Sequence, residues 1–136
     1  MNLILDTNIW ISFLLGKRLS ILSEIFKRND IQIFVSPELI EEINKVATRN
    51  KFKSAISQQS LQNLIELINV RCNWVSSCET EENNLRDKKD LFILGMALNS
   101  SADFIVSGDK DLLVLNQYKS TKIITFSEFK NLIFIE

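Results

Sequence analysis

Acidic side chains recur where apolar, strand-like runs give way to helical ones. Asp6 ends one such run, Asp109 follows another after Ser107 and Gly108, and Glu42 lies in a helical stretch. Asp87 and Asp90 open a later helical stretch. Carboxylates serve as general acids and bases and as ligands for hard divalent cations. These residue types therefore point to acid–base or metal-ion chemistry.

The composition narrows that chemistry further. The 136 residues include no histidine, which excludes a Ser-His-Asp triad and an imidazole zinc ligand. Cys72 and Cys78 are too few for a disulfide scaffold or a four-thiolate zinc site, and they suit a reduced, cytoplasmic protein. The formal net charge of −1 argues against nucleic-acid binding by bulk electrostatics, although a local basic rim is compatible with it.

Apolar patterning predicts strands and helices that alternate along one domain, residues 1–136. Strands are expected at 2–6, 31–35, 70–75, 103–107 and 122–125, and helices at 9–15, 20–28, 37–48, 57–69, 87–99 and 127–133. The apolar stretch 9–15 is far shorter than the roughly 20 residues that span a bilayer, so no membrane segment is expected. The alternation favours a three-layer α/β/α domain around a mostly parallel sheet of four to five strands.

The acids are expected to meet at one edge of this sheet, because open parallel sheets bind ligands beyond the carboxyl ends of their strands. Helical geometry turns Glu42 toward the buried stripe of its helix, whereas Glu38 and Glu41 lie nearer the opposite side. Asp87 and Asp90 are three residues apart and so share a helix face.

Each acid also has a purely structural interpretation. Asp6 and Asp109 are suited to capping the helices that follow them, and Glu42 to a solvated helix surface. Asp103 begins a strand and is interpreted as structural, and Asp111 as a turn residue or a metal contact. The combination favours function, because four clustered carboxylates repel one another unless a cation neutralises them. Without histidine or thiolate, such a cluster suits Mg²⁺ or Mn²⁺, which activate water toward a phosphodiester.

Four short segments carry a family resemblance across essentially the whole chain. They are LDTN at 5–8, SPELIEEI at 36–43, RDKKD at 86–90 and ADFIVSGDKDL at 102–112. Together, in this order, they resemble the PIN-domain family of small metal-dependent ribonucleases. The most similar branch is that of the VapC-like toxins of prokaryotic toxin–antitoxin pairs.

The resemblance implies a PIN-like (Rossmann-like) fold and an endoribonuclease that uses one or two Mg²⁺ or Mn²⁺ ions. Hydrolysis by a metal-activated water would leave 5′-phosphate and 3′-hydroxyl ends. It also implies an RNA substrate, an antitoxin partner and a possible homodimer. The residues that match the family pattern are Asp6, Glu42, Asp90 and Asp109 as metal-binding carboxylates, Asp87 and Asp111 as supporting acids, and Asn8 and Ser107 as groups that orient ligands or water.

Basic residues near these acids are candidates for guiding RNA, although a solvated surface explains them equally well. The sequence departs from the family pattern between Asp87 and Asp90, where two lysines stand in place of the usual proline or further acids. The basic candidates are Lys45, Arg49, Lys51, Lys53, Arg86, Lys88 and Lys89. Trp10, Phe13 and Trp74 are expected to pack in the interior.

Two other functions fit parts of the pattern. A PIN fold that binds RNA or protein without cutting needs no metal, and Asp6→Asn would separate it from a nuclease. A phosphoryl-transfer domain with an aspartate nucleophile is less consistent, because a haloacid-dehalogenase-type site requires a second aspartate where Asn8 stands. A receiver domain requires its aspartate after a middle strand, which the element order does not provide.

Overall fold

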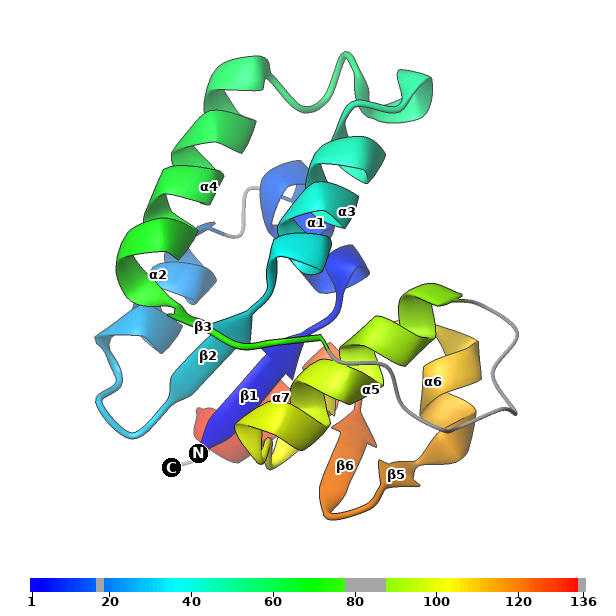
Figure 1. Ribbon diagram of the computed structural model, residues 1–136. Helices are drawn as coiled ribbons and strands as arrows, with labels where there is room; N and C mark the ends of the chain where they lie inside the picture. Colours follow the sequence, from blue (N-terminus) through cyan, green and yellow to red (C-terminus); the bar gives the residue numbers. More distant parts are fainter. Residues whose placement is uncertain (17–18, 78–87, 135–136) are drawn as a thin grey trace.

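A computed structural model describes residues 1–16, 19–77 and 88–134 of the chain (Figure 1). Within these ranges the strands form a six-stranded sheet in the order β3-β2-β1-β4-β6-β5. Only the β5–β6 pair is antiparallel among these strands. The strands are β1 (Asn2–Leu5), β2 (Gln32–Val35), β3 (Asn73–Trp74), β4 (Phe104–Val106), β5 (Gln117–Tyr118) and β6 (Thr121–Ile124). The mostly parallel α/β architecture that the sequence predicts is confirmed.

Helices connect the parallel strands, as right-handed crossover connections require. Those in the described ranges are α1 (Thr7–Leu15), α2 (Leu19–Lys27), α3 (Pro37–Ala47), the 3₁₀ turn η1 (Asn50–Phe52), α4 (Gln58–Arg71), α5 (Lys88–Ser100), α6 (Lys110–Leu115) and α7 (Phe126–Ile133). None of these helices is long and apolar enough to cross a membrane.

The strand order contains a topological switch point between β1 and β4. From β1 the chain adds β2 and then β3 on one side, and it returns to place β4 on the other side. The connections leaving β1 and β4 therefore run in opposite directions, and the crevice between them is where open parallel sheets bind ligands. The residues that follow Leu5 and Val106 lie at this crevice.

Helices cover both faces of the sheet. In Figure 1, α5 crosses in front of β1 and α7 lies behind the sheet. On the α7 side, Trp10 and Phe13 of α1 are fully buried, and Phe13 meets Phe126 edge-on with ring centroids 5.7 Å apart. The expectation that Trp10 and Phe13 belong to the core is confirmed. Edge-to-face aromatic packing of this kind stabilises a core beyond the area that it buries.

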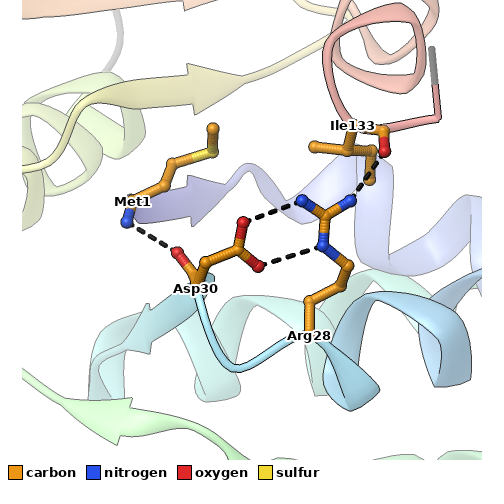
Figure 2. Close-up of polar contacts among 4 residues, drawn as sticks. All are labelled: Met1, Arg28, Asp30 and Ile133. Atoms are coloured by element: carbon orange, nitrogen blue, oxygen red, sulfur yellow. Dashed lines mark hydrogen bonds and ion pairs between the residues drawn. The ribbon is translucent and has the colours of Figure 1, made fainter. Parts of the chain in front are cut away.

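A polar cluster ties the beginning and end of the described chain together (Figure 2). The Arg28 guanidinium donates two hydrogen bonds to the Asp30 carboxylate, at 3.0 and 2.8 Å, and one of 2.6 Å to the Ile133 carbonyl at the end of α7. The Met1 ammonium donates a 2.7 Å hydrogen bond to the Asp30 carbonyl. Arg28 therefore fixes α7 against the loop that precedes β2.

The sequence-based boundaries differ from the structure around β3. The strand predicted at 70–75 shortens to Asn73–Trp74, because α4 continues to Arg71. Trp74, expected to pack inside, is 48% exposed because β3 forms an edge of the sheet, so that prediction is wrong.

Two short elements near the C-terminal end were missed. The helix α6 and the two-residue strand β5 both lie in a stretch that the sequence analysis left unassigned. β5 raises the number of strands to six, one above the expected range, and it pairs only with β6.

Candidate functional site

Asp6 lies at the carboxyl end of β1 and caps α1. Its backbone N–H donates a 2.9 Å hydrogen bond to the Val106 carbonyl, which joins it to the end of β4. Its Oδ1 accepts a 2.8 Å hydrogen bond from the Thr7 N–H. Asp6 is only 7% exposed, so the carboxylate is fixed inside the crevice at the switch point.

Ser107 joins the two acids of the crevice. It follows β4, its side chain is fully buried, and its Oγ donates a 2.7 Å hydrogen bond to Asp6 Oδ2. The same Oγ accepts a 2.9 Å hydrogen bond from the Asp109 N–H. One hydroxyl therefore fixes the Asp6 carboxylate and the backbone at Asp109 relative to each other.

Asp109 caps α6 and is half-buried. Its Oδ1 accepts a 2.9 Å hydrogen bond from the N–H of Asp111, whose own side chain lies exposed at the start of α6. The turn leading into α6 includes the exposed Gly108, and an added Cβ there would meet no atom within 4 Å. The Asp109 side chain is thus oriented by its hydrogen bond at the start of α6, next to an exposed turn residue.

Glu42 is the acid of α3 that turns inward, as its helical position predicts. It is 9% exposed, whereas Glu38 and Glu41 are exposed. The helix that carries it begins at Ser36, whose Oγ accepts a 3.1 Å hydrogen bond from the Leu39 N–H. Because α3 starts directly after β2, which runs parallel to β1, the start of α3 lies at the same edge of the sheet as the carboxyl end of β1.

The remaining predicted acids lie partly or wholly outside the described residues. Asp87 and Arg86 fall outside them, and Asp90, Lys88 and Lys89 are described only as backbone in the first turn of α5. Asn8 is exposed in the first turn of α1. Within the described side chains, no group of three acids or cysteines is close enough to hold a metal ion.

The structural interpretation of the two capping acids is therefore correct, and capping does not exclude a role in metal binding. Each carboxylate oxygen has two lone-pair directions and accepts more than one contact. For Asp6, the hydrogen bonds from the Thr7 N–H and the Ser107 hydroxyl fix the orientation of the carboxylate. Ligating carboxylates are commonly oriented by such hydrogen bonds. Capping and ligation are compatible at both Asp6 and Asp109.

Comparison with the sequence patterns of known families identifies the family of this chain. The sequence pattern of the PIN domain matches residues 2–111, which include both capping acids, Glu42 and Asp90. The chain belongs to the PIN-domain family. The resemblance based on four short segments is thereby confirmed over most of the chain.

A solved structure has a similar fold. It is the crystal structure of VapBC2 from Rickettsia felis bound to a DNA fragment from their promoter, with a TM-score of 0.61 and 14% sequence identity. The superposition covers 92% of this chain and 98% of the other. A comparison with curated protein sequences finds no match.

The basic residues assigned to RNA guidance divide into two groups. The first group is exposed around the far end of α3 and consists of Lys45, Arg49, Lys51 and Lys53. The second group is Arg86, Lys88 and Lys89, whose side chains lie outside those described.

Sequence reasoning did not identify the contact between Ser107 and Asp6. Only the paired strand ends bring these two residues together, and no local pattern signals it.

Proposed function

We propose that this PIN-domain protein is a metal-dependent endoribonuclease whose site lies in the crevice between β1 and β4. The observation that carries the proposal is the buried Ser107 hydroxyl, which joins Asp6 to the backbone of Asp109 at the topological switch point. A carboxylate that is held in one orientation at a topological switch point is well placed to bind a hard cation.

The donor set is consistent with Mg²⁺ or Mn²⁺. Every candidate ligand is a carboxylate oxygen, and the whole chain contains no histidine to favour a softer ion. Asp6, Glu42, Asp90 and Asp109 are the proposed ligands, with Asp87 and Asp111 in support. A bound ion would lower the pKa of a coordinated water, which would make that water a better nucleophile toward an RNA phosphodiester at neutral pH.

The protein's own residues perform the positioning. Ser107 and the Thr7 N–H hold the Asp6 carboxylate in one rotamer, and the cap of α6 holds Asp109. A carboxylate fixed before ligands arrive loses little entropy when it binds, which is the advantage of a preorganised site. Asn8, exposed at the start of α1, is available to contact substrate or water.

The proposal is tested by cleavage of a labelled single-stranded RNA with Mn²⁺, with Mg²⁺ and with EDTA. Asp6→Asn and Asp109→Asn should each abolish metal-dependent cleavage. Asp103→Asn is the matched control, because Asp103 lies at the opposite end of β4, where its Oδ2 accepts a 2.7 Å hydrogen bond from the Asn2 N–H. Products should carry 5′-phosphate and 3′-hydroxyl ends. Cleavage that survives in both site variants would contradict the proposal.

We further propose that the protein acts as the toxin of a toxin–antitoxin pair, with an antitoxin polypeptide as its partner. The support is the VapC-like resemblance of the sequence and the shared fold with a VapBC2 structure. Induced expression in a bacterial host should arrest growth, and Asp6→Asn should relieve the arrest. Equal growth with the wild-type protein and the variant, at equal protein levels, would refute the toxin role while leaving the nuclease activity open.

A further inference from the structure

A groove lies at the end of the sheet formed by β5 and β6, bordered by α6 and α7 (β6 is orange in Figure 1). It has a volume of about 700 Å³ and is open to solvent. More than half of its lining residues are polar, and the apolar ones include Phe104, Leu113, Ile124 and Leu132. Small-ligand sites of this size combine an apolar lining with a few polar groups that fix the ligand. The composition of the groove therefore suits a small ligand.

A cation and an anion line this groove without pairing. Lys122 of β6 and Glu128 of α7 are both exposed there. No ion pair joins them, and neither pairs with another residue of the described ranges. Both charges are therefore available to a ligand that has hydrogen-bond donors at one end and a negative charge at the other.

The Glu128 carboxylate is oriented by the capping box at the start of α7. Its Oε1 accepts a 3.0 Å hydrogen bond from the Thr125 N–H, and the Glu128 N–H donates a 3.1 Å hydrogen bond to Thr125 Oγ1. Hydrogen bonding from the Thr125 backbone, and to a lesser extent its side chain, lowers the pKa of the Glu128 carboxyl. The cap uses Oε1, which leaves Oε2 able to accept hydrogen bonds from a ligand.

Two side-chain amides and an aromatic ring complete the lining. Asn116 follows α6 and Asn131 belongs to α7, and neither amide makes a hydrogen bond within the described part of the chain. The backbone of Asn116 is fixed, because its N–H donates to the Leu113 carbonyl at 3.0 Å and its carbonyl accepts from the Ile123 N–H at 2.9 Å. The half-buried Phe104 ring lines the groove as well. Aromatic rings and amides of this kind bind planar, hydrogen-bonding nucleobases.

We propose that this groove binds the guanine base of a nucleotide, with the phosphate at Lys122. Guanine presents two neighbouring donors, N1–H and N2–H, which one carboxylate accepts together, and its O6 accepts from an amide. Adenine presents the lone pair of N1 at the same edge, which the Glu128 carboxylate repels. Phe104 and Lys122 also line an adjoining groove of about 490 Å³, which leaves space for ribose and phosphate.

The proposal stands apart from the nuclease activity, because the lining of the groove includes no acid of the crevice. A free guanine nucleotide and a guanosine within RNA share the chemistry that the groove would recognise. The experiment therefore includes both sources.

The test is an NMR titration of the isotope-labelled full-length protein with guanosine 5′-monophosphate (GMP) and with the adenosine equivalent (AMP). EDTA is present, so that no metal ion holds phosphate in the crevice or permits RNA cleavage. GMP should shift the side-chain amide signals of Asn116 and Asn131 and bind about tenfold more tightly than AMP. A guanosine-containing tetranucleotide and its all-adenosine counterpart form the second arm. Whichever of GMP and the guanosine tetranucleotide saturates these shifts at the lower concentration is the source of the base.

Glu128→Gln tests the base contact without removing the cap. Glutamine retains an acceptor for the Thr125 N–H, so the capping box persists. The substitution should weaken GMP binding about tenfold and leave AMP binding unchanged, because the guanine donors lose the carboxylate. Glu66→Gln, at an exposed position of α4 outside the groove, is the matched control and should change neither affinity.

Lys122→Ala tests the phosphate contact. It should weaken binding of GMP severalfold and leave binding of guanosine, which has no phosphate, unchanged. Lys27→Ala, at an exposed position of α2, is the matched control and should leave both unchanged. Thermal melts of all variants identify any loss of fold.

Equal affinity for GMP and AMP, or binding of neither, would overturn the proposal. So would a preference for GMP that Glu128→Gln leaves intact, because the base would then be recognised elsewhere. None of these outcomes depends on whether the protein cleaves RNA.

Discussion

Ser107 Oγ donates a 2.7 Å hydrogen bond to Asp6 Oδ2, across 101 positions of the sequence. Both residues directly follow parallel neighbouring strands, and the backbones meet at the 2.9 Å bond from the Asp6 N–H to the Val106 carbonyl. Because Ser107 Oγ also accepts from the Asp109 N–H, removal of one hydroxyl affects both acids of the crevice. The contact therefore offers a direct way to perturb the site without removing a carboxylate.

Ser107→Ala should destabilise the fold and weaken metal binding. It leaves the partly buried Asp109 N–H without this acceptor and removes the hydroxyl that donates to Asp6 Oδ2, which costs about 1–3 kcal/mol in the free energy of unfolding. Loss of a partner that orients a ligand lowers metal affinity about ten- to hundredfold. Urea unfolding and Mn²⁺ titration calorimetry measure the two effects separately.

Matched variants separate positioning from general stability. Ser100→Ala removes another buried hydroxyl, which donates a 3.5 Å hydrogen bond to the Ala97 carbonyl, and it should leave Mn²⁺ affinity unchanged. Ser107→Thr retains the hydroxyl and should recover most of the affinity that Ser107→Ala loses. Wild-type affinity in Ser107→Ala would show that the hydroxyl does not position a metal ligand.

Stability should depend on pH through Asp30. Its hydrogen bonds from Arg28 hold the pKa of the Asp30 carboxyl below its usual range. A group whose pKa is lowered by folding stabilises the native state above its unfolded pKa of about 3.9, and this contribution disappears as the pH falls through the folded value.

Asp30→Asn removes this charge and keeps an amide oxygen as acceptor. The difference in unfolding free energy between wild type and Asp30→Asn should therefore be constant at neutral pH and shrink below about pH 4. Urea unfolding across a pH series measures it. A difference that persists unchanged at acid pH would show that the ion pair does not contribute.

Gly108→Ala should be tolerated and mildly stabilising. No described glycine has a positive φ, and a Cβ at this position meets no atom within 4 Å. The substitution then mainly restricts the unfolded chain, which stabilises the fold by about 0.4–1 kcal/mol. A clear fall in melting temperature would mean that the turn between Ser107 and Asp109 requires glycine after all.

Cys72 should resist alkylation in the native protein. Burial raises the pKa of its thiol to about 12, so almost no reactive thiolate exists at pH 8. Iodoacetamide should label Cys72 rapidly in urea and very slowly without it, as measured by mass spectrometry of the peptide that contains it. Rapid native labelling would indicate that the end of α4 opens readily.

Local patterns predicted well where one residue's surroundings decide its role. The helical periodicity of α3 placed Glu42 inward, and the helix predicted to begin at residue 37 begins there, capped by Ser36. The alternation of strands and helices predicted the parallel sheet, because crossover connections leave few other arrangements.

Features that depend on the position of a strand within the sheet could not be predicted in this way. Trp74 is exposed because β3 is an edge strand, and the sequence does not mark which strand is at the edge. Leu98 of α5 is 48% exposed, although it lies in a mostly apolar run. The strand β5 is only two residues long, too short for a periodic signal.

Direct Mn²⁺ binding tests the central claim with the fewest assumptions, because it needs no knowledge of the RNA substrate. Titration calorimetry on the wild-type protein should show binding that Asp6→Asn and Asp109→Asn each weaken at least about tenfold, while Asp103→Asn binds like wild type. If the folded wild-type protein binds no Mn²⁺, or if both site variants bind it as tightly, then the crevice between β1 and β4 is not a metal centre and the protein is a non-catalytic PIN-fold module.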